Sequence, residues 1–337
     1  MGTLGVICVI AAIGSIVVGY ITDAVLAKRL RSGRSRDASA LVIPPEDLSP
    51  ITGLDFTRFQ SYENAAAALA ARMGIRGVAR FDARSGVRAD GIEITAQLIH
   101  PNVVTDSAER ALLERIFPVL EPGATSHPQR GPQPWSDASS AAIRANLEDA
   151  RRRGLLTRES NVLGMALGIG AIALAVAGAA LLSSEAPRGE DTLWLWLVIL
   201  IPIGGAAIGL LLPNQKSPSE AAQPIVLTLE GIRAATKLPA DALIGQIVGE
   251  LQRMHGHGSR PHPHQIAATA EALMPYAIAF NTHKTYADTI ASVRSTLGLD
   301  GNAYPWLTVR DRHGAPMPAS QQLRTFVDGM SSLSNPN

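Results

Sequence analysis

Long runs of apolar residues alternate with mixed, charged segments along this chain. Three of the runs contain no charged residue, at 1–22, 161–182 and 193–212. An α-helix rises about 1.5 Å per residue, so each run would cover the roughly 30 Å of a bilayer core. The pattern therefore predicts three transmembrane helices, the second and third joined by a short external loop at 183–192.

The charges that flank these runs predict their orientation. Basic residues follow the first run and precede the second, whereas the loop at 183–192 is mainly acidic. Cytoplasmic loops are enriched in Lys and Arg, so we expect a multi-pass protein of the bacterial inner (plasma) membrane, with the N-terminus outside and the C-terminus cytoplasmic. The first run lacks the basic start of a signal peptide, which favours an uncleaved anchor, with cleavage near Ala27 as the alternative.

Small residues recur on one face of the second run. Gly164, Gly168 and Gly178, together with Ala171 and Ala175, follow one another at intervals of three or four residues. Such a face lets helix backbones approach closely. We expect it to pack within the hairpin of the second and third runs, and a homodimer through Gly164, Gly168 and Gly178 is the alternative. The three runs contain no Asp, Glu, Lys, Arg or His, which argues against a transporter or a pump.

The segment between the first two runs predicts a linker and a small module. Residues 23–58 are basic and rich in proline, and residues 59–158 alternate between helical and strand periodicities. The Asp106-x-x-Glu109 spacing predicts a helix start. We expect a winged-helix-like α+β module on the cytoplasmic side. Its predicted elements are a helix at 59–73, strands at 78–81 and 92–98, and helices at 106–120 and 138–153.

Winged helices often bind DNA, so the charge of this module decides between two functions. The helix at 106–120 is balanced between basic and acidic residues, and the whole chain carries a net charge of +1, from 30 basic and 29 acidic residues. Affinity for nucleic acid depends on a clustered positive charge. We therefore expect no nucleic-acid partner, and a membrane-tethered DNA-binding regulator is kept as an alternative.

Helical periodicity returns after the third run. Residues 225–300 predict a helical domain, a small bundle on the cytoplasmic side, with helices at 241–254, 265–273 and 282–297. The remaining residues, 301–337, contain several prolines and predict a poorly ordered tail.

Four histidines lie within ten residues of this domain, at His255, His257, His262 and His264. Two His-x-His pairs supply imidazole ligands suited to zinc, copper or nickel. The same stretch is rich in glycine and proline, which is typical of a solvated loop, and no carboxylate or cysteine nearby completes a site. The only cysteine, Cys8, excludes an internal disulfide. A solvated loop is the preferred interpretation, and a metal site is the alternative.

Catalytic signatures are missing from the sequence. It contains no Gly-x-Ser-x-Gly elbow, no phosphate-binding loop ending in Gly-Lys-Ser/Thr and no His-Glu-x-x-His. We therefore expect a non-enzymatic scaffold or interaction protein without a cofactor, whose partners are the lipid bilayer and other proteins on the cytoplasmic side. A metal-dependent sensor or enzyme that uses the cluster from His255 to His264 is the alternative.

Several short motifs, taken in order, resemble a family of predicted bacterial and archaeal membrane proteins, the domain-of-unknown-function family twenty-two-oh-seven. The resemblance covers roughly residues 44–297. Its pieces are Pro44 to Pro50, Ile75-Arg76-Gly77-Val78, Glu109 to Phe117, Arg153-Gly154-Leu155, Leu229-Glu230-Gly231, and Pro275 to Ala279 followed by Phe280.

The resemblance implies a membrane protein without an established activity or catalytic residues. Family members typically carry a large extracytoplasmic β-rich domain ahead of the first span, and we expect this domain to be lacking here. The expected fold is thus a membrane α-helical protein with three transmembrane helices, a cytoplasmic α+β winged-helix-like module and a C-terminal helical bundle.

Overall fold

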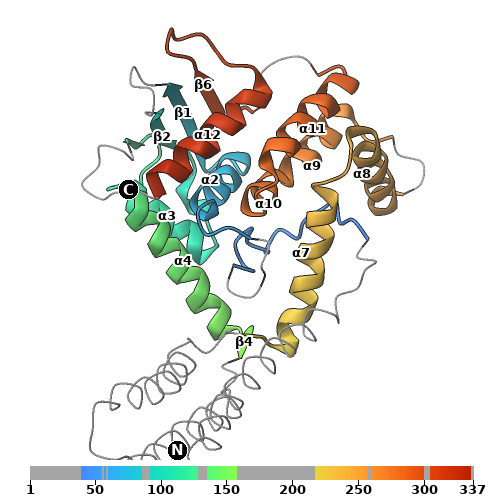
Figure 1. The fold of residues 1–337 in the computed structure, drawn as a ribbon, viewed down its shortest axis with the longest axis horizontal. Helices are drawn as coiled ribbons and strands as arrows, with labels where there is room; N and C mark the ends of the chain where they lie inside the picture. The colour runs from blue at the N-terminus through green and yellow to red at the C-terminus, as the bar shows by residue number, and fades with distance from the viewer. Residues whose placement is uncertain are drawn as a thin grey trace, which may run out of the picture. The chain divides into compact units, whose positions relative to one another are not determined.

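The computed structural model divides the chain into two compact units, residues 1–36 with 157–217 and residues 37–156 with 218–337. The residues that it describes are drawn in colour in Figure 1, and almost all of them belong to the second unit. The described residues are 39–54, 57, 60–85, 92–127, 135–157, 217–256, 260–299 and 304–334.

A four-stranded mixed sheet lies at one side of this unit. Strands β1 (Ala79–Ser85) and β2 (Ile92–Leu98) form an antiparallel pair in which Phe81 lies opposite Ala96. The short β3 (Thr125–Ser126) extends the β2 edge, and β6 (Leu307–Arg310) runs parallel to β1 along its other edge. The strand order is therefore β3-β2-β1-β6, and a strand from near the end of the chain completes a hairpin from its first third.

The helices pack around a central helix, α2 (Ala65–Ile75), which is apolar on nearly every side. A helix of that kind is stable only when other elements surround it. Helices α3, α4, α9, α10 and α12 all contact α2. The remaining bounds are α3 (Ser107–Ile116), α4 (Trp135–Arg152), α7 (Gln223–Ala235), α8 (Ala240–His255), α9 (Pro263–Ala272), α10 (Met274–Ala279), α11 (His283–Thr296) and α12 (Ala319–Ser334), with short 3-10 turns η1 (Pro101–Val103) and η2 (Glu220–Ala222) and a two-stranded ribbon of β4 (Leu156–Thr157) and β5 (Ser217–Pro218).

An aromatic cluster joins the N-terminal and C-terminal parts of the unit. The ring of Phe81 on β1 lies 5.3 Å from that of Phe326 on α12 and 6.3 Å from that of Trp306, centroid to centroid. Gly74 on α2 lies directly against the Trp306 ring, where a β-carbon would collide with it. The two parts of the chain therefore share one core rather than forming separate modules.

Several local predictions are confirmed. Strand β2 has the predicted bounds, and its register with β1 makes the predicted hairpin. Asp106 is the N-cap of α3, where its side chain accepts hydrogen bonds from the N–H groups of Ala108 and Glu109. Helix α4 ends before Gly154, whose φ of +68° is the left-handed conformation expected at a helix C-terminus.

The expected fold class is wrong. Within the described ranges the protein is an α+β fold of helices and a four-stranded mixed sheet, and no helix there is long and apolar enough to cross a membrane. This finding overturns the expected membrane α-helical fold and the multi-pass plasma-membrane localisation. The runs at 1–22, 161–182 and 193–212, with Gly164, Gly168 and Gly178, lie outside the described residues.

The expected division into a winged-helix-like module, a helical bundle and a poorly ordered tail is also corrected. The hairpin is not a free wing, because β6 pairs with β1 and α12 packs against β2. Two prolines of the predicted tail lie beside ordered elements, since Pro305 precedes β6 and Pro318 precedes α12. Within the predicted linker at 23–58, residues 39–54 are packed and contribute buried side chains to the core.

Candidate functional site

A chain segment without regular secondary structure crosses four helices of the unit. We call residues 39–54 the strap. Its backbone bonds to α7, where the N–H of Leu41 donates to the carbonyl oxygen of Gly231 at 2.9 Å. Its carbonyl oxygens accept from side chains on α2, α10 and α4. The strap therefore depends on side-chain donors to satisfy its backbone, as buried irregular segments must.

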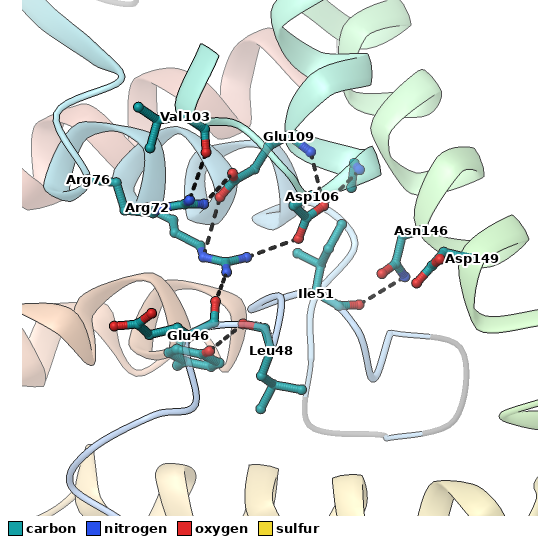
Figure 2. A network of polar contacts seen from close by, with 12 residues as sticks. Glu46, Leu48, Ile51, Arg72, Arg76, Val103, Asp106, Glu109, Asn146 and Asp149 are labelled. Carbon is teal, nitrogen blue, oxygen red and sulfur yellow. Dashed lines mark hydrogen bonds and ion pairs between the residues drawn. The ribbon is translucent and has the colours of Figure 1, made fainter. Parts of the chain in front are cut away.

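Arg72 of α2 is the central donor to the strap. Its Nη2 donates to the carbonyl oxygen of Glu46 at 2.6 Å, and its Nη1 donates to Oδ2 of Asp106 at 2.9 Å. Figure 2 shows the guanidinium between the strap and the first turn of α3. One side chain thus links the strap, α2 and α3.

Glu109 completes the network from the α3 side. Its Oε1 lies 3.3 Å from Nε of Arg72, and its Oε2 accepts from Nη1 of Arg76 at 2.9 Å (Figure 2). The Glu109 side chain is 0% exposed. Burial raises the pKa of this carboxyl to about 7; the nearby Arg72 and Arg76 act to lower it, while Asp106 raises it. The balance is decided by the large cost of removing a carboxylate from water.

Three further side chains hold the strap along its length. The hydroxyl of Tyr276 on α10 donates to the carbonyl oxygen of Leu48 at 2.6 Å, and Asn146 Nδ2 on α4 donates to that of Ile51 at 3.1 Å. Gln60 Nε2 donates to the carbonyl oxygen of Pro50 at 2.6 Å. Burial raises the pKa of the Tyr276 phenol, so this group stays a donor.

The strap also requires close backbone approach at α7. A β-carbon at Gly231 would lie 3.0 Å from the carbonyl oxygen of Ser39 and 3.1 Å from the β-carbon of Leu41. Glycine is the residue that permits such contact. Four residues from the motifs of the family resemblance lie in or around this site. Gly231 and Tyr276 bond to the strap, and Arg76 and Glu109 pair with each other in the network beside it.

The chemistry available to this network is structural. Arg72, Arg76, Asp106 and Glu109 pair with one another, and the arginines additionally bind backbone carbonyls. Groups that are committed to each other in this way fix the positions of chain segments. Because burial raises the pKa of Glu109 to about 7, the charge of this network changes near neutral pH.

The network ends at an exposed apolar surface. Nη2 of Arg76 donates to the carbonyl oxygen of Val103 at 3.0 Å (Figure 2), and the Val103 side chain is 47% exposed. Val119 and Leu120, in the loop after α3, are 53% and 39% exposed. We call these three residues the apolar patch. A pocket of about 170 Å³ adjoins it, lined by Pro101, Asn102, Val104, Arg110, Leu113 and Leu120.

The histidines proposed as metal ligands have local structural roles where they are described. His262 is the N-cap of α9: its Nδ1 accepts from the backbone N–H of His264 at 3.3 Å, and the two rings stack 5.3 Å apart. Nδ1 of His255 lies 3.0 Å from the carbonyl oxygen of Leu251 in its own helix. His257 lies outside the described residues. Within the part of the chain that the structure describes, no group of three or more His, Cys, Asp or Glu is placed to hold a metal ion.

Sequence reasoning missed Arg72 and gave Glu109 a different role. The capping pattern predicts that Glu109 serves the start of α3, whereas its carboxylate pairs with Arg72 and Arg76. The sequence did contain a sign of the importance of Arg72. Arg72 directly follows the alanine-rich run 65–71, and an arginine on such an apolar helix must find buried partners. The identity of those partners depends on segments remote in sequence.

Comparison of the chain with models of known protein families, with curated proteins and with solved structures finds no match. The resemblance to the family of unknown function therefore stays a prediction. Function has to be inferred from the geometry of the described residues.

Proposed function

We propose that this chain is a non-enzymatic interaction protein that binds a protein partner through the apolar patch. The observation that carries the proposal is a pocket that the exposed Leu120 helps to line. The exposed Val103 and Val119 are the direct sequence neighbours of its lining residues Val104 and Leu120. Contiguous exposed apolar side chains beside polar ones are typical of interaction surfaces, whereas isolated ones are ordinary.

Hydrogen bonds that hold the backbone at and beside the patch support the proposal. Arg76 holds the carbonyl oxygen of Val103, and Arg110 holds that of Val104 through a 3.0 Å hydrogen bond from Nη2. Arg76 is in turn fixed by the buried Glu109. A surface held in its binding conformation loses less conformational freedom when a partner docks, and this strengthens binding.

Proximity labelling with the full chain in its native cells tests the proposal. The patch variant combines Val103→Asp and Leu120→Asp, and the matched control is Leu227→Asp, which places the same charge at a 48% exposed leucine on α7. We expect specific neighbours to be labelled by the wild type and by the control, and to be lost with the patch variant. Labelling of the same neighbours by all three proteins would contradict the proposal.

A further inference from the structure

The pocket beside the apolar patch combines apolar walls with two polar groups. Pro101, Val104, Leu113 and Leu120 supply the apolar walls, and Asn102 and Arg110 supply the polar ones. Its volume of about 170 Å³ is below the range typical of sites for drug-sized molecules. It suits a single aliphatic side chain of about leucine size.

Arg110 gives this pocket a charge preference. One of its N–H groups is used, in the 3.0 Å hydrogen bond from Nη2 to the carbonyl oxygen of Val104, which orients the guanidinium at the pocket wall. An arginine side chain has five N–H donors, so others remain for a ligand. Arg110 is exposed to solvent. Among the described residues, no acidic side chain forms an ion pair with it.

We propose that the pocket binds a peptide segment in which an aliphatic side chain stands next to a carboxylate. The aliphatic side chain enters between Leu113 and Leu120, and the carboxylate pairs with Arg110. This inference rests on the proposed function and specifies the chemistry of the partner. Guanidinium and carboxylate match in geometry as well as in charge, so a neutral or basic neighbour is disfavoured at this position.

Fluorescence anisotropy with the purified full chain tests the pairing. The probe is a fluorescein-labelled 12-residue peptide with alternating leucine and glutamate; a second peptide has lysine for each glutamate, and a third has serine for each leucine. We expect the leucine–glutamate peptide to bind at least about tenfold more tightly than either counterpart, since a charge-assisted hydrogen bond and a buried aliphatic side chain each contribute on that scale.

Variants assign the binding to the pocket. Leu120→Asp should abolish binding of the leucine–glutamate peptide, Arg110→Gln should weaken it about tenfold, and Leu227→Asp should leave it unchanged. Because Arg110 also orients Val104, salt dependence gives a second measure on the wild type. Raising the salt concentration should weaken the binding of the leucine–glutamate peptide more than that of the leucine–lysine peptide, since salt screens the attraction between exposed opposite charges.

The outcomes separate this inference from the proposed function. If the leucine–lysine peptide binds as tightly as the leucine–glutamate peptide, or if Arg110→Gln has no effect and binding is insensitive to salt, the carboxylate pairing is overturned. The same holds if no peptide binds while the patch variant still loses its labelled neighbours, or if the patch instead joins two copies of the chain in sedimentation equilibrium. Loss of the proximity-labelling difference refutes the proposed function itself.

Discussion

Glu109→Gln is the most direct probe of the network that holds the strap. The substitution keeps the size of the side chain and removes its titration. In the wild type the pKa of Glu109 is raised from its ordinary value of 4.5 to about 7, so the folded protein holds this proton more tightly than the unfolded chain does. A group of this kind favours the folded state most at low pH. That contribution is lost as the pH rises through the folded-state value.

The size of the effect follows from the pKa difference. A pKa difference of one between the folded and unfolded states corresponds to about 1.4 kcal/mol of stability. The rise of the Glu109 pKa from 4.5 to about 7 therefore corresponds to about 3 kcal/mol, lost between these two pH values. The carboxylate is fully buried, so solvent screening does not reduce the figure appreciably. The Gln variant should therefore gain stability relative to the wild type as the pH rises from 4.5 to 7, by about 3 kcal/mol.

Urea denaturation of both proteins between pH 4 and pH 8 measures this difference. Fluorescence of the buried Trp135 and Trp306 reports unfolding, and contributions from other titrating groups cancel in the comparison. Glu114→Gln removes the same charge from an exposed position on α3 and should change stability by less than about 0.5 kcal/mol at each pH.

The opposite slope would refute this account of the network. If the Gln variant loses stability relative to the wild type as the pH rises, attraction to Arg72 and Arg76 outweighs the cost of burying the carboxylate. Glu109 would then be a conventional ion-pair partner, and the strap would be held more firmly at neutral pH than at acidic pH.

Three further predictions concern the strap and the C-terminal helices. Tyr276→Phe should cost about 1–2 kcal/mol in urea denaturation, because the carbonyl oxygen of Leu48 loses a buried donor, and an unchanged midpoint would contradict this. Gly231→Ala should be at least about 1 kcal/mol less stable than its control Gly245→Ala, since a β-carbon meets the strap at 3.0 Å in the first case and nothing within 4 Å in the second. Burial lowers the pKa of His283, which is 2% exposed, so the neutral imidazole contributes stability above pH 6.5 that is lost on acidification. Thermal unfolding should show the wild type losing stability relative to His283→Phe between pH 7 and pH 5. Melting temperatures that change in parallel for the two proteins would contradict this prediction.

Local structure was largely predictable from the sequence because its causes are local. The alternation of Ile92, Ile94, Ala96 and Leu98 predicts a strand with one buried face, and β2 has that pattern. The carboxylate of Asp106 predicts the start of α3, since a helix start needs an acceptor for its first N–H groups. These features depend on neighbours within a few residues.

The assembly of these elements was not predictable in the same way. Nothing near β1 in sequence indicates that β6 would pair with it, because the two strands are more than two hundred residues apart. The candidate site likewise forms from segments that are remote in sequence. Arg72 of α2 meets Glu46 of the strap and, at the start of α3, Asp106 and Glu109. The apolar patch is recognisable only when solvent exposure is known.

The pairing of β1 with β6 sets a condition on synthesis. A ribosome makes β1, β2 and α2 long before β6 and α12, so the hairpin emerges with an unpaired edge and with Phe81 uncovered. Closing so long an interval is entropically slow, and open strand edges invite aggregation. Nascent chains that stall before residue 307 should consequently depend on chaperones, whereas released full-length chains complete the sheet themselves.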